Sequence, residues 1–160
     1  MRKMATAFIC LAIFAGCGRI NVADAKIITD KGFESDITLI WKDKTYSGNI
    51  SSVPPDILTL NVWGENLTVP VKYEISQGGY SLSQGDLGLK IPYSEAPPES
   101  VAVIVYEAFL AAAQAEVSTD KGIAVYTLPT AIIKQDIEND TLISIEMKDG
   151  QITFSNFILT

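Results

Sequence analysis

The sequence predicts an α+β domain in which one helix packs on an antiparallel sheet. Apolar and polar residues alternate with a period of two over most of the chain after residue 32, and turn signals separate the alternating runs. A single segment with helical periodicity divides these runs into two groups. No strand–helix–strand repeat supports a parallel sheet. We therefore expect six strands, one helix and four further strands, in that order.

The first six strands are expected between Phe33 and Ile91. The strand that begins at Phe33 alternates apolar and polar residues, and Asp43-Lys44 is placed to turn it into a hairpin. The clearest alternation runs from Leu67 to Ile75, so we expect one strand over these nine residues. Pro70 falls among the polar positions of this alternating run, and a proline there favours an edge strand or a β-bulge.

The helix is expected to begin within Ser94–Ser100 and to continue to about Glu116. Prolines in this segment suit a first helical turn, and its acidic residues complement the positive end of the helix dipole. Apolar residues that include Phe109 then recur at helical spacing, while Glu107 lies on the other side. This amphipathic pattern predicts a helix that covers the sheet.

Four strands are expected after the helix, over residues 122–128, 130–137, 141–148 and 151–159. Asp149-Gly150 separates the last two, and this dipeptide is typical of a type I′ turn with positive φ at its central residues. Glu138-Asn139-Asp140 is expected to form the preceding turn.

The N-terminus predicts export and lipidation. Arg2 and Lys3 precede an apolar run from Met4 to Ala15, which is too short to span about 30 Å of hydrocarbon as a helix. Phe14-Ala15-Gly16-Cys17 resembles the lipobox of bacterial lipoproteins, a resemblance that implies acylation of Cys17 and cleavage before it. We expect a signal peptide over residues 1–16, the lipidated cysteine and a tether over 17–32, and one domain over 33–160. The alternative is an ordinary secretory signal that leaves Cys17 as a free thiol.

Composition excludes several classes of function. The chain has no histidine, so it has no imidazole base or ligand. After removal of the signal peptide, 10 basic residues face 19 acidic ones, which argues against a nucleic-acid partner and against attraction to anionic headgroups. The aspartates lack the spacing of a calcium loop. We expect no enzymatic activity, no metal site and no cofactor.

The lipobox, the strand pairs, the Gly78-Gly79-Tyr80 strand, one helix and a closing strand at residues 152–157 together resemble small uncharacterised lipoproteins of clostridial type. These are similar in outline to the LolA, LolB and LppX class of half-open β-barrels. That resemblance implies a curved antiparallel sheet around an apolar cavity, packed by helix, and a role in carrying lipids or lipoproteins.

The resulting expectation is a lipoprotein held to the cell membrane by its N-terminal lipid anchor, on the extracytoplasmic side. We hypothesise that it binds or carries a lipid or another apolar ligand between sheet and helix, in contact with Leu67, Val69, Val71, Tyr73 and Phe109. The same residues would equally form an ordinary filled core. The alternative function is a tethered, non-enzymatic interaction module of the cell envelope, with a protein partner that the sequence does not identify.

Overall fold

The computed structural model describes residues 31–54, 56–64 and 67–160. The predicted signal peptide, Cys17 and the tether as far as residue 30 lie outside the described residues.

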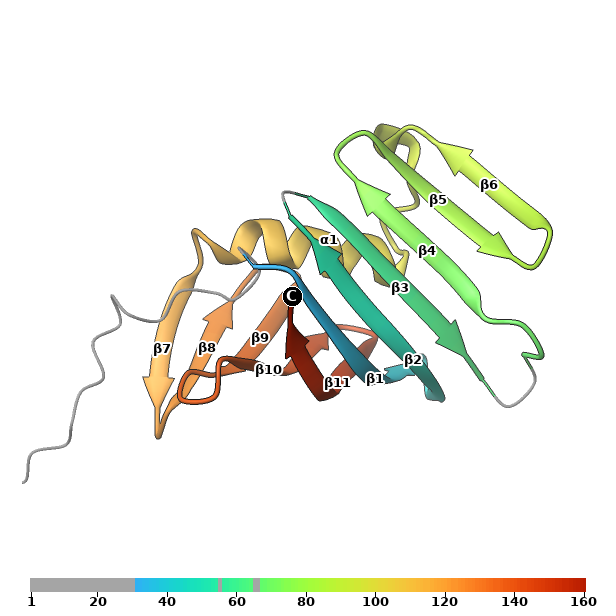
Figure 1. Cartoon of the computed structure of the whole chain (residues 1–160). Helices are drawn as coiled ribbons and strands as arrows, with labels where there is room; N and C mark the ends of the chain where they lie inside the picture. The colour runs from blue at the N-terminus through green and yellow to red at the C-terminus, as the bar shows by residue number, and fades with distance from the viewer. Residues whose placement is uncertain (1–30, 55, 65–66) are drawn as a thin grey trace, which may run out of the picture.

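In the described part of the chain, eleven strands form one antiparallel sheet, and a single α-helix, α1 (Val101–Ala112), packs on it. The spatial order is β6-β5-β4-β3-β2-β1-β11-β10-β9-β8-β7, so the first and last strands of the chain pair at the centre of the sheet (Figure 1). The sheet is open, with β6 and β7 at its two edges. The strands are β1 (Phe33–Trp41), β2 (Lys44–Val53), β3 (Ile57–Trp63), β4 (Val71–Ser76), β5 (Gly79–Gln84), β6 (Leu87–Ile91), β7 (Glu116–Asp120), β8 (Ile123–Thr127), β9 (Ala131–Asp136), β10 (Thr141–Met147) and β11 (Gly150–Leu159).

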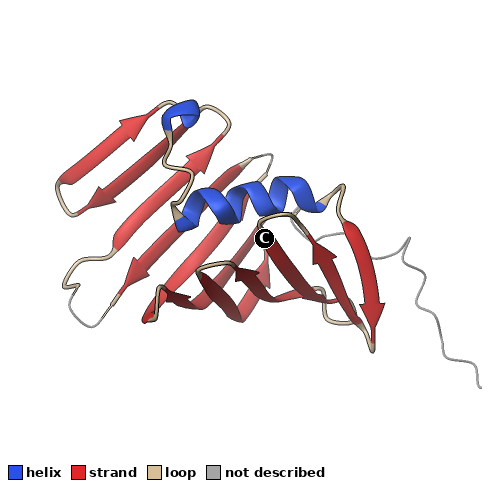
Figure 2. Ribbon diagram, turned by 180° about the vertical axis from the view of Figure 1, so that it is seen from behind, coloured by secondary structure: helices blue, strands red, loops and turns tan. Residues whose placement is uncertain are grey.

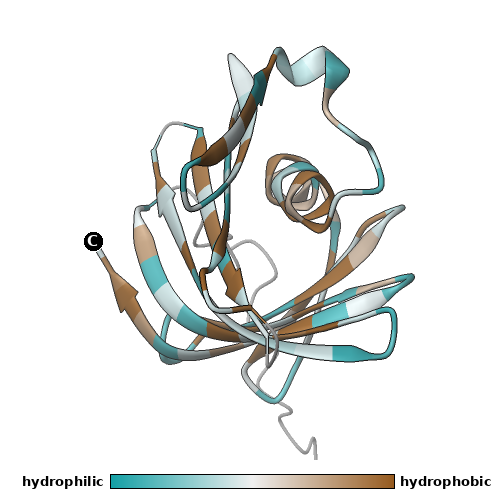
Figure 3. Cartoon of the chain, turned by 90° about the vertical axis from the view of Figure 1, so that its right-hand side faces the viewer, coloured by the Kyte–Doolittle hydropathy of each residue, from teal (hydrophilic) through white to brown (hydrophobic). Residues whose placement is uncertain are grey.

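The sheet is curved, and α1 lies on its concave side. Figure 2 shows the helix crossing one face of the sheet, and Figure 3 shows the strands bending around it. Period-two alternation explains the arrangement, because β1 buries every second side chain toward the helix and exposes the others. The sequence-based prediction of an antiparallel sheet with one helix is confirmed at this level, although the fold is mostly β.

One hydrophobic core joins the two halves of the sheet. It includes Phe33 of β1, Val105 and Phe109 of α1, and Ile133 and Ile152 from the second half of the chain. The core residues in the described part of the chain lie between positions 33 and 157, so the segment from residue 31 onward contains a hydrophobic core of the kind that independent folding requires.

Two tight turns contain residues with positive φ at both central positions. Lys42 and Asp43, with φ of 48° and 65°, join β1 to β2, and Lys121 and Gly122, with φ of 48° and 81°, join β7 to β8. Positive φ at both central residues is the requirement of a type I′ hairpin, whose twist matches that of the strands. The predicted hairpin after β1 is therefore confirmed, with its turn one residue earlier than expected.

The prediction of a strand from Leu67 to Ile75 was wrong at its start, since β4 begins at Val71. Pro70 lacks the N–H that a strand paired on both sides must donate, so pairing with β3 and β5 starts after it. The prediction of four strands after the helix was also wrong. The additional strand is β7 (Glu116–Asp120), whose short and mostly polar sequence lies between the predicted helix and the first of the four predicted strands.

The helix is shorter than predicted at both ends. Residues Tyr93–Glu95 form a separate 3-10 helix, and Ala96 adopts extended backbone geometry with ψ of 140°. Such geometry is what a residue before proline favours, and Ala96 precedes Pro97. Therefore α1 starts only at Val101, and it ends at Ala112, a few residues before β7 begins at Glu116.

Gly150 does not form the predicted type I′ turn. The chain turns at residues 148–149, and neither Asp149 nor Gly150 has a positive φ. Gly150 instead pairs with Trp41 in the centre of the sheet. A Cβ atom there would lie 2.1 Å from the Ile40 carbonyl oxygen, so the glycine permits close approach of β1.

Candidate functional site

The concave face of β1–β5 presents rows of apolar and aromatic side chains that the strand register aligns. Leu60, Tyr73 and Leu82 are direct neighbours across β3, β4 and β5. Val62 and Val71 form the adjacent row. Because neighbours in register share one face of the sheet, these residues make a continuous apolar surface.

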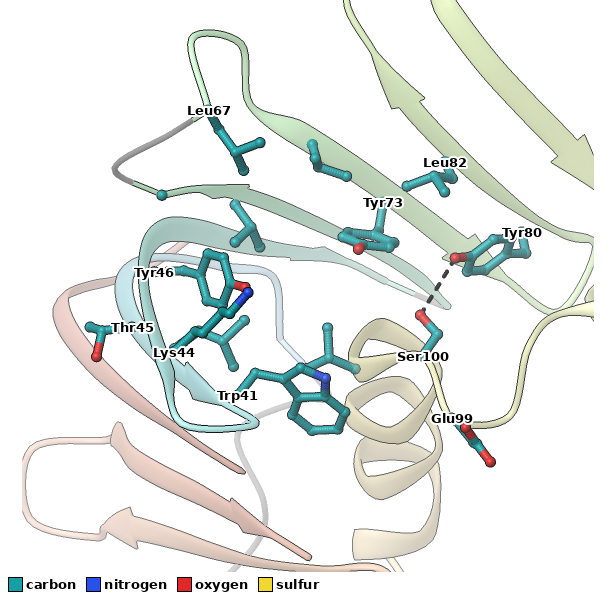
Figure 4. Close-up of a pocket in the computed structure, with 15 residues that line it drawn as sticks. Trp41, Lys44, Thr45, Tyr46, Leu67, Tyr73, Tyr80, Leu82, Glu99 and Ser100 are labelled. Atoms are coloured by element: carbon teal, nitrogen blue, oxygen red, sulfur yellow. Dashed lines mark hydrogen bonds between the residues drawn. The ribbon is translucent and has the colours of Figure 1, made fainter. Parts of the chain in front are cut away.

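A pocket of about 920 Å³ lies over this surface, next to the start of α1 (Figure 4). Its volume falls within the range of about 300–1,000 Å³ that is typical of small-ligand sites. The walls come from β1–β5, from the segment after β3 and from the residues that lead into α1. The lining residues that decide its character are Leu39, Trp41, Tyr46, Val62, Leu67, Val71, Tyr73, Tyr80, Leu82 and Val101.

Tyrosine side chains give the pocket polar atoms within an apolar wall. The rings of Tyr73 and Tyr80 lie 6.4 Å apart at an angle of 58°. The hydroxyls of Tyr80 and Ser100 are 3.4 Å apart, which connects β5 to the residue before α1. Burial raises the pKa of Tyr73, and the neighbouring Tyr80 and Tyr46 contribute to the same shift. Tyr73 is therefore a neutral phenol at neutral pH and can donate a hydrogen bond to a ligand.

Gly64 leaves space that the Tyr46 ring occupies. A Cβ atom on Gly64 would lie 3.0 Å from Cδ1 of Tyr46. The ring therefore lies directly against the backbone at Gly64, immediately after β3, and the missing side chain allows Tyr46 to form part of the pocket wall.

Two charged side chains border the pocket. Lys44, at the start of β2, shares a face with Tyr46 and is the cross-strand partner of Trp41. Glu99 lies beside the start of α1, and Figure 4 shows it well separated from Lys44, with Trp41 between them in this view.

Three of the five predicted ligand-contacting residues, Leu67, Val71 and Tyr73, line this pocket. Val69 does not line it, and its side chain is 41% exposed. Phe109 lies in the core, where its ring and the ring of Phe33 form a T-shaped pair with a centroid distance of 5.8 Å. The prediction of ligand contact itself stays a prediction.

The sequence analysis did not select several other lining residues, among them Trp41, Tyr46, Tyr80 and Leu82. The alternation of side chains along each strand could have identified the first two, because Trp41 and Tyr46 occupy positions of β1 and β2 whose side chains face inward. Which inward-facing residues border a pocket depends on where α1 starts, and the predicted start was several residues too early.

Other kinds of site have less support in the described residues. No group of three or more His, Cys, Asp or Glu side chains in residues 31–54, 56–64 and 67–160 is arranged to hold a metal ion. Across the same residues, no helix has both the length and the apolar character that crossing a bilayer requires.

Comparison of the chain with models of known protein families gave no match, and comparison with curated protein sequences gave none either.

Proposed function

We propose that this protein is a membrane-anchored lipoprotein that binds a lipid or another apolar ligand on the concave face of its sheet. The proposal combines the lipobox at residues 14–17 with the pocket beside α1. Acyl chains on Cys17 hold the protein at the extracytoplasmic side of the cell membrane, and the domain that starts at Phe33 binds the ligand.

The observation that carries the ligand proposal is the pocket of about 920 Å³ and its lining. A core that packs to normal density leaves few voids larger than a water molecule, so a space of this size at the core's edge is a binding-site candidate. Aliphatic side chains such as Val62, Val71 and Leu82 favour the burial of an apolar group.

The charge distribution supports anchoring through lipid rather than through the protein surface. The mature chain carries 10 basic and 19 acidic residues, so anionic headgroups repel it on average. Stable attachment then depends on acyl chains, of which a single one gives only marginal binding.

Native mass spectrometry tests the ligand proposal. Residues 18–160 are secreted without the anchor, purified without detergent and analysed before and after extraction with organic solvent. We expect an added mass that the solvent releases and that is identified as a lipid. A bare polypeptide that stays bare after incubation with host lipids contradicts the proposal.

Mass analysis of the full-length protein tests the anchor. We expect the mature chain to begin at Cys17 with the added mass of acyl groups, and a Cys17→Ala variant to remain unprocessed. Cleavage after Ala15 or Gly16 without acylation contradicts the lipoprotein proposal.

The second candidate function is an envelope interaction module, and the edge strand β6 favours it. This strand pairs only with β5, and its side chains Leu87 and Leu89 are 77% and 48% exposed. An unpaired and apolar edge is suited to strand addition by a partner. Loss of a specific envelope partner on Leu89→Pro, with retention on Lys90→Gln, supports this function, and equal binding by both variants contradicts it.

A further inference from the structure

We propose that the ligand of the pocket is an amphiphile with an anionic headgroup, and that Lys44 binds this headgroup. The inference rests on the proposed ligand-binding function and specifies the chemical class of the ligand.

Charged residues of the first six strands are segregated by face, with one exception. Glu34, Asp36, Lys72, Glu74 and Lys90 alternate with inward-facing residues and therefore lie on the convex face. Lys44 is the only charged residue of β1–β6 whose position in its strand faces the concave side of the sheet, as its pairing with Trp41 shows. A lone cation among apolar and aromatic side chains is the arrangement that binds the anionic end of an otherwise apolar molecule.

The surroundings of Lys44 leave its charge available to a ligand. The ion pairs between described residues involve Lys31, Lys72 and Lys134, and Lys44 takes part in none of them. The side chain is exposed at the mouth of the pocket, so a headgroup bound there keeps partial contact with water. This lowers the desolvation cost of pairing two charges.

The second charge at the pocket sets the orientation of the ligand. Glu99 lies on the other side of Trp41 in Figure 4, and it repels an anion at the end of the pocket next to α1. The apolar rows formed by Val62 with Val71 and by Leu60, Tyr73 and Leu82 run between β3 and β5. An acyl chain whose headgroup contacts Lys44 therefore lies along these rows.

The test is a calorimetric titration of delipidated residues 18–160 with three probes that have the same chain length. Palmitate is anionic, monopalmitoylglycerol is neutral, and hexadecyltrimethylammonium is cationic. We expect palmitate to bind most tightly and Lys44→Met to weaken its affinity about tenfold, the usual scale for loss of one charged contact. The affinity for monopalmitoylglycerol should change less than twofold.

Lys72→Met is the matched control, because Lys72 lies on the convex face of β4 beside Glu74, at an Nζ–Oε2 distance of 3.2 Å. This variant should bind all three probes as the unmodified protein does. If all three probes bind equally and Lys44→Met changes nothing, the headgroup inference is wrong and the apolar-ligand function stands. If none of the probes binds and no host lipid copurifies, the proposed function itself is wrong.

Discussion

Gly150→Ala should strongly destabilise the protein, because the glycine allows β1 and β11 to approach at the centre of the sheet. The added Cβ would lie 2.1 Å from the Ile40 carbonyl oxygen and 2.8 Å from Cε3 of Trp41. Nonbonded heavy atoms prefer separations of about 3.5–4.0 Å, so the two strands would have to separate by roughly 1.5 Å or more. Neither obstacle is a flexible side-chain end, since one is backbone and the other belongs to a large ring.

We expect the free energy of unfolding to fall by about 3 kcal/mol, the upper part of the range for overpacking. For a domain of this size, that loss lowers the melting temperature by roughly 10 °C. Urea unfolding of residues 18–160, followed by Trp fluorescence and by circular dichroism, measures both the midpoint and the slope.

Gly88→Ala is the control for this prediction. Gly88 lies in the edge strand β6, and its nearest obstacles, the Leu82 carbonyl oxygen and the Ser83 Cβ, are both 3.9 Å away. This variant should stay within about 0.5 kcal/mol of the unmodified protein. Equal and small effects of the two substitutions would refute the close approach at Gly150.

Two further predictions concern side-chain hydrogen bonds. Tyr106 is buried and its hydroxyl has no hydrogen-bond partner among the described residues, whereas the Tyr126 hydroxyl donates to Oε1 of buried Gln135 at 3.4 Å. Tyr106→Phe should therefore leave stability unchanged or raise it, while Tyr126→Phe should lower it by about 1–2 kcal/mol in urea unfolding; the reverse order would contradict this. Hydrogen bonds from the Asn139 side chain and from backbone N–H groups lower the pKa of the Asp136 carboxyl. The ionised carboxylate therefore stabilises the fold at pH values above the pKa that Asp136 has in the unfolded chain, and this stabilisation is lost as the pH falls through the pKa of the folded protein. A carboxyl ¹³C titration should give a midpoint below 3.8, and a midpoint at or above that value would contradict the turn geometry.

The sequence predicted the class of fold because its strongest signals are local. Alternation in β1 and a charged turn after it identify the first hairpin, and six strands before the helix are recovered in the correct order. Errors came where tertiary contacts override local pattern. Asp149-Gly150 has the composition of a type I′ turn, yet Gly150 is required for contact with a strand more than one hundred residues away in sequence.

The pocket was less predictable than the sheet. Val71 and Tyr73 were selected because alternation places them on an apolar face, and they line the pocket. Phe109 was selected for the same reason from the helix, but the position of α1 puts it in the filled core. Periodicity identifies which face of an element is buried, whereas the difference between a filled core and a pocket depends on where the covering helix begins.

The most direct test of the central claim, that an apolar ligand occupies the concave face, is quenching of Trp fluorescence by a brominated acyl chain. The chain has two tryptophans, and Trp41 lines the pocket. Trp63 follows the pocket residue Val62 directly on β3, so its side chain faces the opposite side of the sheet. Trp63→Phe and Trp41→Phe each leave a single reporter, and each variant is titrated with stearate and with stearate brominated at mid-chain. We predict that the brominated chain quenches Trp41 and leaves Trp63 unchanged. Equal quenching of both tryptophans, or of neither, would contradict a ligand site on the concave face.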